Sequence, residues 1–257
     1  MKLNQGNYFT DENKYLSNSK VSDWLKDKHY FYKKHITGEI NSPVTDAMVL
    51  GSAVDTWLTE SKEAFEAQYI QVTRRSKKGD TPWRYQLTKT MYDSVENMCT
   101  NAETSPAVLQ LQKEYKAQEI MQCDIELTHF KGLCGIPDWY RVDGDTADIV
   151  DLKTAQSIDV HKYHYKCLDL GYYRQQAFYQ IMLEKKYGCT NFMSRHLVIE
   201  KDPDNINHVQ TFILNQEKIE AEKDFLFQIF ESIKKEVDFA PHRATWDEAI
   251  EIGGIIV

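Results

Sequence analysis

The sequence predicts an α/β fold in which helices flank one mixed β-sheet. Apolar residues recur at helical spacing in the first hundred residues, whereas short runs of β-forming residues separated by turn residues occupy the middle of the chain. No internal repeat, low-complexity tract or Pro/Gly-rich linker divides the 257 residues. We therefore expect one domain, with a helical part over about 1–118, a sheet core over about 119–215, and a C-terminal helix and tail over about 216–257.

The composition narrows the class of protein. No apolar run approaches the roughly 20 residues that span a bilayer, and the N-terminus lacks the apolar stretch of a secretory signal, so we expect a cytoplasmic protein without a membrane partner. The five cysteines are scattered without a CxxC pair, which favours reduced thiols over disulfides or a metal cluster. A net charge of −8 argues against nucleic acid, unless a local basic groove or bound metal ions supply positive charge.

Helical patterns dominate the first part. Residues 17–35 offer Ser17 or Ser19 as an N-cap, and residues 42–60 carry apolar side chains at helical spacing. Residues 62–85 lack this helical spacing, and their basic and turn-forming residues predict a loop. Another helix is expected over residues 85–102.

The period then changes to that of strands. The predicted strands lie within residues 121–130, 133–142, 147–154, 194–201 and 208–214, the last two being joined by the turn 202–207. A long helix between them ends at Gly188, which can act as a C-cap. The segment HKYHYK at 161–166 is expected to be a polar loop leading into this helix. A final amphipathic helix carries apolar residues from Ile219 to Val237.

A hairpin over residues 135–154 gathers charged side chains on one face. With Gly144-Asp145 as its loop, Asp138 lies opposite Asp151; with Asp143-Gly144, it lies diagonal to Asp151. In both registers Asp138, Asp151 and Lys153 share a face, with Cβ atoms of the two acids roughly 5–8 Å apart. Paired carboxylates suit a hard divalent ion such as Mg²⁺, and the adjacent lysine can act on a water or on charge developing at phosphorus. A surface hairpin with solvated charges is the alternative.

Asp138 after Pro137, followed by Asp151-Leu152-Lys153, resembles the PD-(D/E)xK nuclease signature. Gln175 and Tyr179, four residues apart on one helix face, are similar to the QxxxY motif of the RecB-like branch. The stretch LGSAVD resembles that branch's helix motif, except that Asp55 stands where the family has a metal-binding histidine. The overall likeness, from about residue 15 to about residue 215, is to RecE-type exonucleases and their phage relatives.

The resemblance implies a restriction-endonuclease-like core and a site that binds Mg²⁺ or Mn²⁺. Asp55, Asp138 and Asp151 would hold the metal, with the backbone carbonyl of Leu152 as a further ligand. Lys153 would act on the water or the transition state, and Gln175 and Tyr179 would brace the site or contact DNA. Glu126 reads as an exposed strand residue. Glu60 lies five residues beyond Asp55, off that residue's helix face, and is left out of the site.

The implied activity is a metal-dependent DNA exonuclease that resects duplex ends 5′→3′ for phage-type recombination in a bacterial host. Linear duplex ends or single strands would be its substrates, with a homo-oligomeric ring and a single-strand annealing protein as expected partners. The densest basic run, at Arg74, Arg75, Lys77 and Lys78, is a candidate DNA-binding loop; a solvated loop is the alternative.

Two further functions stay open. The same chemistry could serve an endonuclease or a single-strand nuclease, although the scattered cysteines disfavour the cluster-bearing enzymes of CRISPR adaptation. A degenerate nuclease fold could instead bind DNA or protein without cutting. Asp55 in place of histidine and the acidic charge favour that third hypothesis, whereas the intact residues Asp138, Asp151, Lys153, Gln175 and Tyr179 oppose it.

Overall fold

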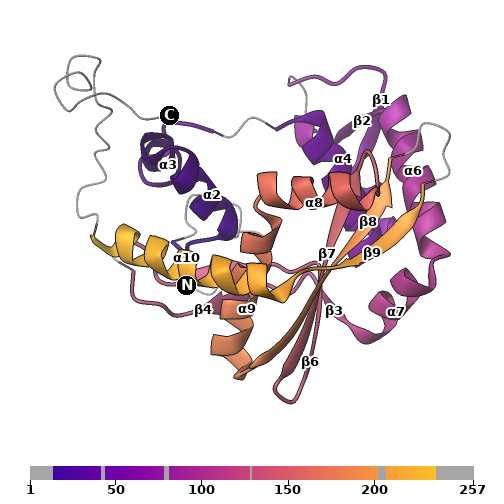
Figure 1. Cartoon of the computed structure of the whole chain (residues 1–257). Coiled ribbons are helices and arrows are strands. Elements are labelled where there is room, and N and C mark those ends of the chain that lie inside the picture. The colour runs from indigo at the N-terminus through magenta and orange to yellow at the C-terminus, as the bar shows by residue number, and fades with distance from the viewer. Residues whose placement is uncertain (1–13, 42–43, 78–80, 128, 202–206, 236–257) are drawn as a thin grey trace.

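The central sheet has five strands in the order β3-β6-β7-β8-β9, as the computed structural model shows (Figure 1). The structure describes residues 14–41, 44–77, 81–127, 129–201 and 207–235. The strands of this sheet are β3 (Lys116–Ala117), β6 (Trp139–Asp143), β7 (Thr146–Ala155), β8 (Asn191–Glu200) and β9 (Val209–Ile213). Only β7 and β8 pair in parallel; the other pairs are antiparallel, so the sheet is mixed as predicted. The parallel pair requires a crossover, which two helices supply.

Helices cover both faces of the sheet (Figure 1). One layer contains α4 (Asp46–Asp55), α5 (Lys62–Gln68), α6 (Lys89–Glu103) and α7 (Pro106–Glu114). The other contains α2 (Asn18–Lys26), α3 (Lys28–His35), α8 (Val160–Asp169), α9 (Tyr172–Tyr187) and α10 (Gln216–Lys235). Alternation along β7 explains the two cores: Ile149 packs with the α9 layer, whereas Val150 and Leu152 pack with the α4 layer.

Two small sheets complete the fold. Strands β1 (Ile70–Val72) and β2 (Gln86–Thr88) pair in parallel, and β4 (Met121–Cys123) and β5 (Leu133–Gly135) pair antiparallel. A short 3₁₀ turn, η2 (Trp83–Tyr85), precedes β2. Helix α4 continues into one π-helical turn, η1 (Thr56–Glu60), in which the amide of Ser61 donates to the carbonyl of Thr56 at 3.2 Å.

Several local predictions are confirmed. Ser17 caps α2, accepting a hydrogen bond from the amide of Lys20, and Gly188 ends α9 with φ +72°. The final helix is present, although Val237 and residues 202–206 of the expected turn lie outside the described residues. No helix in the described ranges is long and apolar enough to cross a membrane.

Other local predictions are wrong. The expected loop over 62–85 contains α5, β1 and η2, and the expected polar loop at 161–166 is part of α8. Helix α8 buries only Tyr163 and Cys167, four residues apart, so its apolar stripe is too narrow to stand out among its polar residues. Helix α7 and strand β3 were not predicted, and β4 ends at Cys123 rather than running on to residue 130.

Candidate active site

The β6–β7 hairpin carries the acidic pair. Asp143 pairs with Thr146 and Trp139 with Val150, so Gly144 and Asp145 form the two-residue loop. Gly144 has φ +57°, a conformation that favours glycine. Continued by one residue, this register sets Asp138 opposite Asp151, which is the first of the two predicted arrangements.

Asp138 is fixed against the neighbouring strand. Its Oδ2 accepts a hydrogen bond of 2.6 Å from the backbone amide of Leu152. Trp139 points to the other face, where it is buried in the core of the α4 layer. The hairpin therefore presents the Asp138 carboxylate beside Asp151 while its neighbouring side chain anchors the strand.

Gln175 forms hydrogen bonds with both Asp151 and Lys153, the charged residues of the Asp151-Leu152-Lys153 segment (the DLK segment). Its Nε2 donates to Asp151 Oδ1 at 2.8 Å, and its Oε1 accepts from Lys153 Nζ at 3.1 Å. Lys153 also forms an ion pair with Asp151, and its ammonium lies 4.7 Å from the ring centroid of Tyr172. One amide side chain on α9 thus sets the positions of both β7 groups.

Tyr179 supports Gln175 from one helical turn away. The hydroxyl of Tyr179 donates to the backbone carbonyl of Ile136 at 3.0 Å and accepts from Gln175 Nε2 at 3.3 Å. Gly135 makes room for this ring: a Cβ there would lie 2.9 Å from Tyr179 Cε1. The structure therefore places Gln175 and Tyr179 on one helix face against the hairpin, as their spacing predicts.

Asp55 reaches the site from the opposite layer, at the end of α4. Both of its carboxylate oxygens accept hydrogen bonds from Gln118 Nε2, at 3.1 and 3.0 Å. Gln118 follows β3 with φ +51°, and its backbone amide donates to the carbonyl of Asp138 at 3.3 Å. Gln118 was missed by sequence reasoning, because no local pattern marks a glutamine that follows a two-residue strand.

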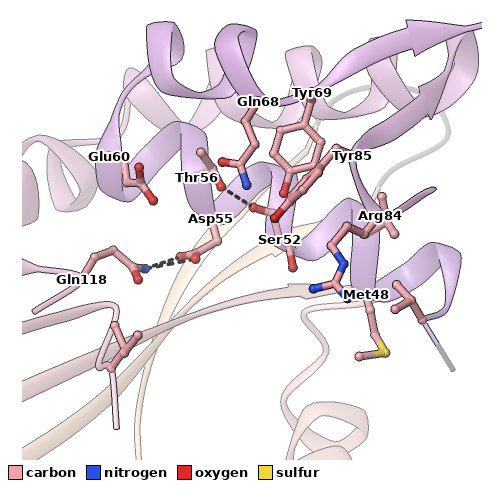
Figure 2. Close-up of a pocket in the computed structure, with 13 residues that line it drawn as sticks. Met48, Ser52, Asp55, Thr56, Glu60, Gln68, Tyr69, Arg84, Tyr85 and Gln118 are labelled. Carbon is pink, nitrogen blue, oxygen red and sulfur yellow. Dashed lines mark hydrogen bonds between the residues drawn. The ribbon is translucent and has the colours of Figure 1, made fainter. Parts of the chain in front are cut away.

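The position of Glu60 differs from the one expected from the sequence. Glu60 was left out of the site because residues five apart point in different directions on an α-helix. The turn from Thr56 to Glu60 is π-helical, however, and bonding between residues five apart brings Glu60 back toward the side of Asp55. Asp55 and Glu60 consequently line the same pocket, shown in Figure 2.

Burial and repulsion between neighbouring carboxylates change the pKa values of the charged groups in the site. Burial, with the nearby charges of Asp151 and Glu60, raises the pKa of Asp55 to about 7. Burial, with the charges of Asp151 and Asp55, also raises the pKa of Asp138 well above its usual range. Burial lowers the pKa of the Lys153 ammonium, but attraction from Asp151 and Asp138 outweighs it, so that pKa is raised overall. The lysine is therefore a cation at neutral pH.

The donor chemistry of these acids fits a hard divalent cation, because the site concentrates carboxylate oxygens whose repulsion a cation would relieve. Each carboxylate is engaged by a protein neighbour: Asp55 by Gln118, Asp138 by the amide of Leu152, and Asp151 by Lys153 and Gln175. Within the described ranges no group of three or more His, Cys, Asp or Glu residues is arranged to hold a metal. The metal-ligand roles of these acids and of the Leu152 carbonyl remain predictions.

His196, also not predicted, lies beside Asp151 on the neighbouring strand β8. It pairs with Asp151 across the β7–β8 ladder, is fully buried, and its Nδ1 shares a 2.8 Å hydrogen bond with the hydroxyl of Tyr163. Burial and the charge of Lys153 hold the pKa of His196 well below its usual value. It is a neutral imidazole beside Asp151 on the same face of the sheet.

The predicted basic loop divides into two kinds of residue. The Arg75 guanidinium lies 3.4 Å from the Trp83 ring centroid, forms an ion pair with Asp46 and donates to the carbonyl of Trp83. Arg74 and Lys77 are exposed. Lys78 lies outside the described residues. Arg75 therefore holds the loop against α4, while DNA binding by the run stays a prediction. The exposed Glu126 forms an ion pair with Lys234 on α10.

A mixed sheet flanked by helices, with an aspartate and a D-x-K segment facing each other across a hairpin, defines a restriction-endonuclease-like fold of the PD-(D/E)xK class. The chain belongs to the family described as a PDDEXK-like domain of unknown function (DUF3799), which matches residues 17–241. No curated protein matches the sequence.

A solved structure agrees on the fold. The chain resembles the crystal structure of a candidate exonuclease from Eubacterium rectale with a TM-score of 0.65 and 18% identity, covering 100% of this chain and 95% of that one. A phage-related exonuclease from Haemophilus somnus 129PT matches over 73% of this chain and 84% of its own, at 12% identity and a TM-score of 0.31. The first likeness confirms the fold; the second is too distant to support an argument.

Proposed function

We propose that the protein is a divalent-metal-dependent deoxyribonuclease that hydrolyses phosphodiester bonds. The observation that carries this proposal is the linked arrangement of Asp151, Lys153 and Gln175 beside Asp138. A solvated surface hairpin would not bury Asp151, which is 1% exposed, nor join its charges to a glutamine on a packed helix. The PDDEXK-like family and the exonuclease description of the Eubacterium rectale protein support the same function.

Each residue has a role in this proposal. Asp55, Asp138 and Asp151 would hold Mg²⁺ or Mn²⁺, with the Leu152 carbonyl as a further ligand. A bound dication supplies positive charge beside the scissile phosphate and favours the ionised form of a nearby water. Lys153 orients the attacking water or stabilises charge developing on the phosphate oxygens.

Gln175 and Tyr179, the QxxxY pair, keep the other groups of the site in position. Gln175 holds Lys153 and Asp151 at fixed positions, and Tyr179 holds Gln175 and the backbone ahead of Asp138. Such bracing matters because a displacement of about 1 Å at a reacting group can cost about 100-fold in rate.

The finer features of the proposal follow the RecE-type resemblance. They are exonucleolytic attack at duplex ends, a 5′→3′ direction, a homo-oligomer, and an annealing protein that receives the single strand. Exposed Arg74 and Lys77 are proposed to contact backbone phosphates, which would offset the acidic charge of the chain locally.

A non-cleaving DNA- or protein-binding module is the second candidate. Two features favour it: Asp55 stands where the RecB-like branch that the sequence resembles has a histidine, and in this structure Gln118 occupies both Asp55 oxygens. Aspartate is nonetheless a good ligand for Mg²⁺ and Mn²⁺. The two candidates differ in whether metal-dependent cleavage occurs at all.

The test is digestion of linear duplex labelled at either its 5′ or its 3′ end, beside closed circular DNA, with Mg²⁺, Mn²⁺ or EDTA. We expect loss of linear DNA only, with the 5′ label released first. Asp151→Asn, which removes charge but keeps shape, should abolish cleavage, whereas Asp169→Asn at an exposed position of α8 should not. Cutting of circles would indicate an endonuclease, and the absence of any metal-dependent loss would favour the binding module.

A further inference from the structure

A pocket of about 470 Å³ opens next to Asp55 (Figure 2). Its floor is formed by buried side chains of α4, of η1 and of the residue between α5 and β1, namely Val49, Thr56 and Tyr69. Its rim is formed by exposed residues, namely Met48, Ser52, Glu60, Gln68 and Arg84. The pocket is therefore a hollow with a buried base and a rim that is accessible from solvent.

The pocket is continuous with the candidate active site. It shares Asp55, Gln118 and Ile136 with that site, and Ile136 is the residue whose carbonyl accepts from Tyr179. Figure 2 shows Asp55, Gln118 and Glu60 along one side. A molecule filling the pocket would have one end at the carboxylates that we propose as metal ligands.

The other side of the pocket has a different chemistry. Tyr85, Arg84 and Met48 lie there, across from Asp55 (Figure 2). The Tyr85 ring is held edge-on against Tyr69, with centroids 5.6 Å apart, and Met48 is 53% exposed. An aromatic ring and a polarisable thioether form a wall on which a flat, apolar face can stack.

Arg84 provides a cation with no protein partner in the described part of the chain. It makes no hydrogen bond or ion pair with those residues, in contrast to Arg75 in the same region, which is held by Asp46 and the Trp83 carbonyl. An uncommitted guanidinium on the rim of an aromatic-walled pocket suits a ligand that combines a planar ring with an anionic group.

We propose that this pocket receives one unpaired nucleotide of the DNA strand being cleaved, its base stacked against Tyr85 and Met48 and its phosphate within reach of Arg84. This inference rests on the proposed nuclease function and specifies its substrate as a strand that is unpaired at the site. The volume lies within the roughly 300–1,000 Å³ typical of small-ligand pockets, and a base still paired and stacked in a duplex cannot enter it.

Binding can be tested without cleavage. Asp151→Asn protein would be titrated into a single-stranded oligonucleotide whose end nucleotide is 2-aminopurine, with fluorescence quenching as the signal of stacking. We expect quenching, and about tenfold weaker binding when Tyr85→Ala is added, which is the scale of one base–aromatic stack. Tyr85→Phe should retain the quenching. Tyr165→Ala, at a 66% exposed position outside the pocket, is the matched control.

Met48→Trp is a second, independent test, needed in case the Tyr85 variants do not fold. The substitution is at an exposed position and fills the pocket with a larger side chain. If the pocket takes an unpaired nucleotide, the wild type should cleave ends with one mismatched terminal nucleotide faster than fully paired ends, because a mismatched base is easier to unpair. In the otherwise wild-type protein Met48→Trp should slow cleavage of fully paired ends and abolish this expected preference. The pocket proposal would be overturned if neither variant, Tyr85→Ala or Met48→Trp, changed the quenching or the mismatch preference.

The two proposals fail in different ways. Quenching that depends on Tyr85, in a protein that never cleaves DNA, would support the nucleotide pocket and refute the nuclease. Metal-dependent cleavage that is indifferent to both pocket variants would support the nuclease and refute the nucleotide pocket. Quenching equally strong with the free nucleotide monophosphate as with the oligonucleotide would also refute a pocket for a strand.

Discussion

Gln118 holds the carboxylate of Asp55 by both oxygens, at 3.1 and 3.0 Å. The two residues come from different layers, because Asp55 ends α4 and Gln118 follows the edge strand β3. Gln118 adopts φ +51°, a backbone conformation that costs a non-glycine residue about 1–3 kcal/mol and persists where its surroundings impose it. The contact thus ties the sheet edge to the helix that carries the proposed metal ligand.

Replacing Gln118 tests whether this contact prepares Asp55 for a metal. The amide lowers the pKa of Asp55 against the effect of burial, so Gln118→Ala should make ionisation of Asp55 harder and weaken metal binding. We expect the half-saturating Mn²⁺ concentration to rise about 10- to 100-fold, the usual scale for groups that orient a ligand. Metal titration by calorimetry and by cleavage rate measures it, with exposed Gln110→Ala as control. An unchanged titration curve would contradict the role.

The raised pKa of Asp55 also predicts how stability depends on pH in EDTA. Its pKa is about 7 in the folded protein and near 3.8 when unfolded, so between these values the folded state binds more protons. Stability should therefore fall as pH rises from about 4 to about 7, by about 2 kcal/mol from this group after solvent screening. Denaturant unfolding at several pH values measures it.

Asp55→Asn is the control for the pH experiment. This variant should lack the fall in stability between about pH 4 and about pH 7 that we attribute to Asp55. The difference from wild type therefore separates the contribution of Asp55 from those of the other carboxyl groups. Added Mn²⁺ should restore stability to the wild type near pH 7, and much less to Asp55→Asn. A wild-type protein whose stability rises from pH 4.5 to 7 in parallel with the variant would show that Asp55 is ionised throughout.

Gln175→Ala separates positioning from binding. Without the amide, Asp151 and Lys153 keep their ion pair but lose the bonds that fix both groups to α9. We expect kcat to fall about 10- to 100-fold with little change in KM. Gln175→Glu should not rescue it, because a carboxylate would repel Asp151, and Gln228→Ala at an exposed position should be neutral. A change confined to KM would point to contact with DNA instead.

The parts of the site that local patterns specify were predictable. Strand alternation puts Asp138, Asp151 and Lys153 on one face in either hairpin register, so the choice of register did not affect that conclusion. The spacing of Gln175 and Tyr179 places them on one helix face. Each inference needs only the period of a single element or of one hairpin.

The remaining parts depend on contacts between distant segments. Gln118 meets Asp55 across 63 positions of sequence, and nothing near either residue indicates the other. The π-helical turn that brings Glu60 into the pocket follows a helix whose sequence has ordinary α-helical spacing. Helix α8 was missed because tertiary packing against the sheet, rather than a broad apolar stripe, stabilises it.

The basic run offers a test that separates structure from DNA binding. Arg75→Ala should lower stability by about 1–2 kcal/mol, because it removes a buried stack on Trp83 and the ion pair with Asp46. Arg74→Ala and Lys77→Ala should leave stability unchanged but weaken DNA binding, each reducing the salt dependence by about one phosphate contact. Thermal unfolding and binding at several salt concentrations measure the two effects. Unchanged salt dependence in both exposed variants would remove this loop from the DNA interface.

Gly135→Ala should damage the site through Tyr179. A Cβ at position 135 would lie 2.9 Å from Tyr179 Cε1 and 3.3 Å from Met182 Sδ, so the ring must move and its hydrogen bonds with Ile136 and Gln175 weaken. We expect a loss of about 1–3 kcal/mol in the free energy of unfolding, as for other overpacked cores, together with a fall in kcat like that of Gln175→Ala.

Gly51→Ala is the matched stability control, because a Cβ there meets only Thr154 Oγ1 at an ordinary 3.9 Å. In the interior of α4, alanine should raise stability by about 0.5–1 kcal/mol over glycine. Combining Gly135→Ala with Tyr179→Leu should recover part of the lost stability, since the smaller side chain relieves the clash, but should not recover kcat, since the hydroxyl is gone. Recovery of both in the double variant would mean that Tyr179 only fills space, and that Gln175 holds Asp151 and Lys153 without it.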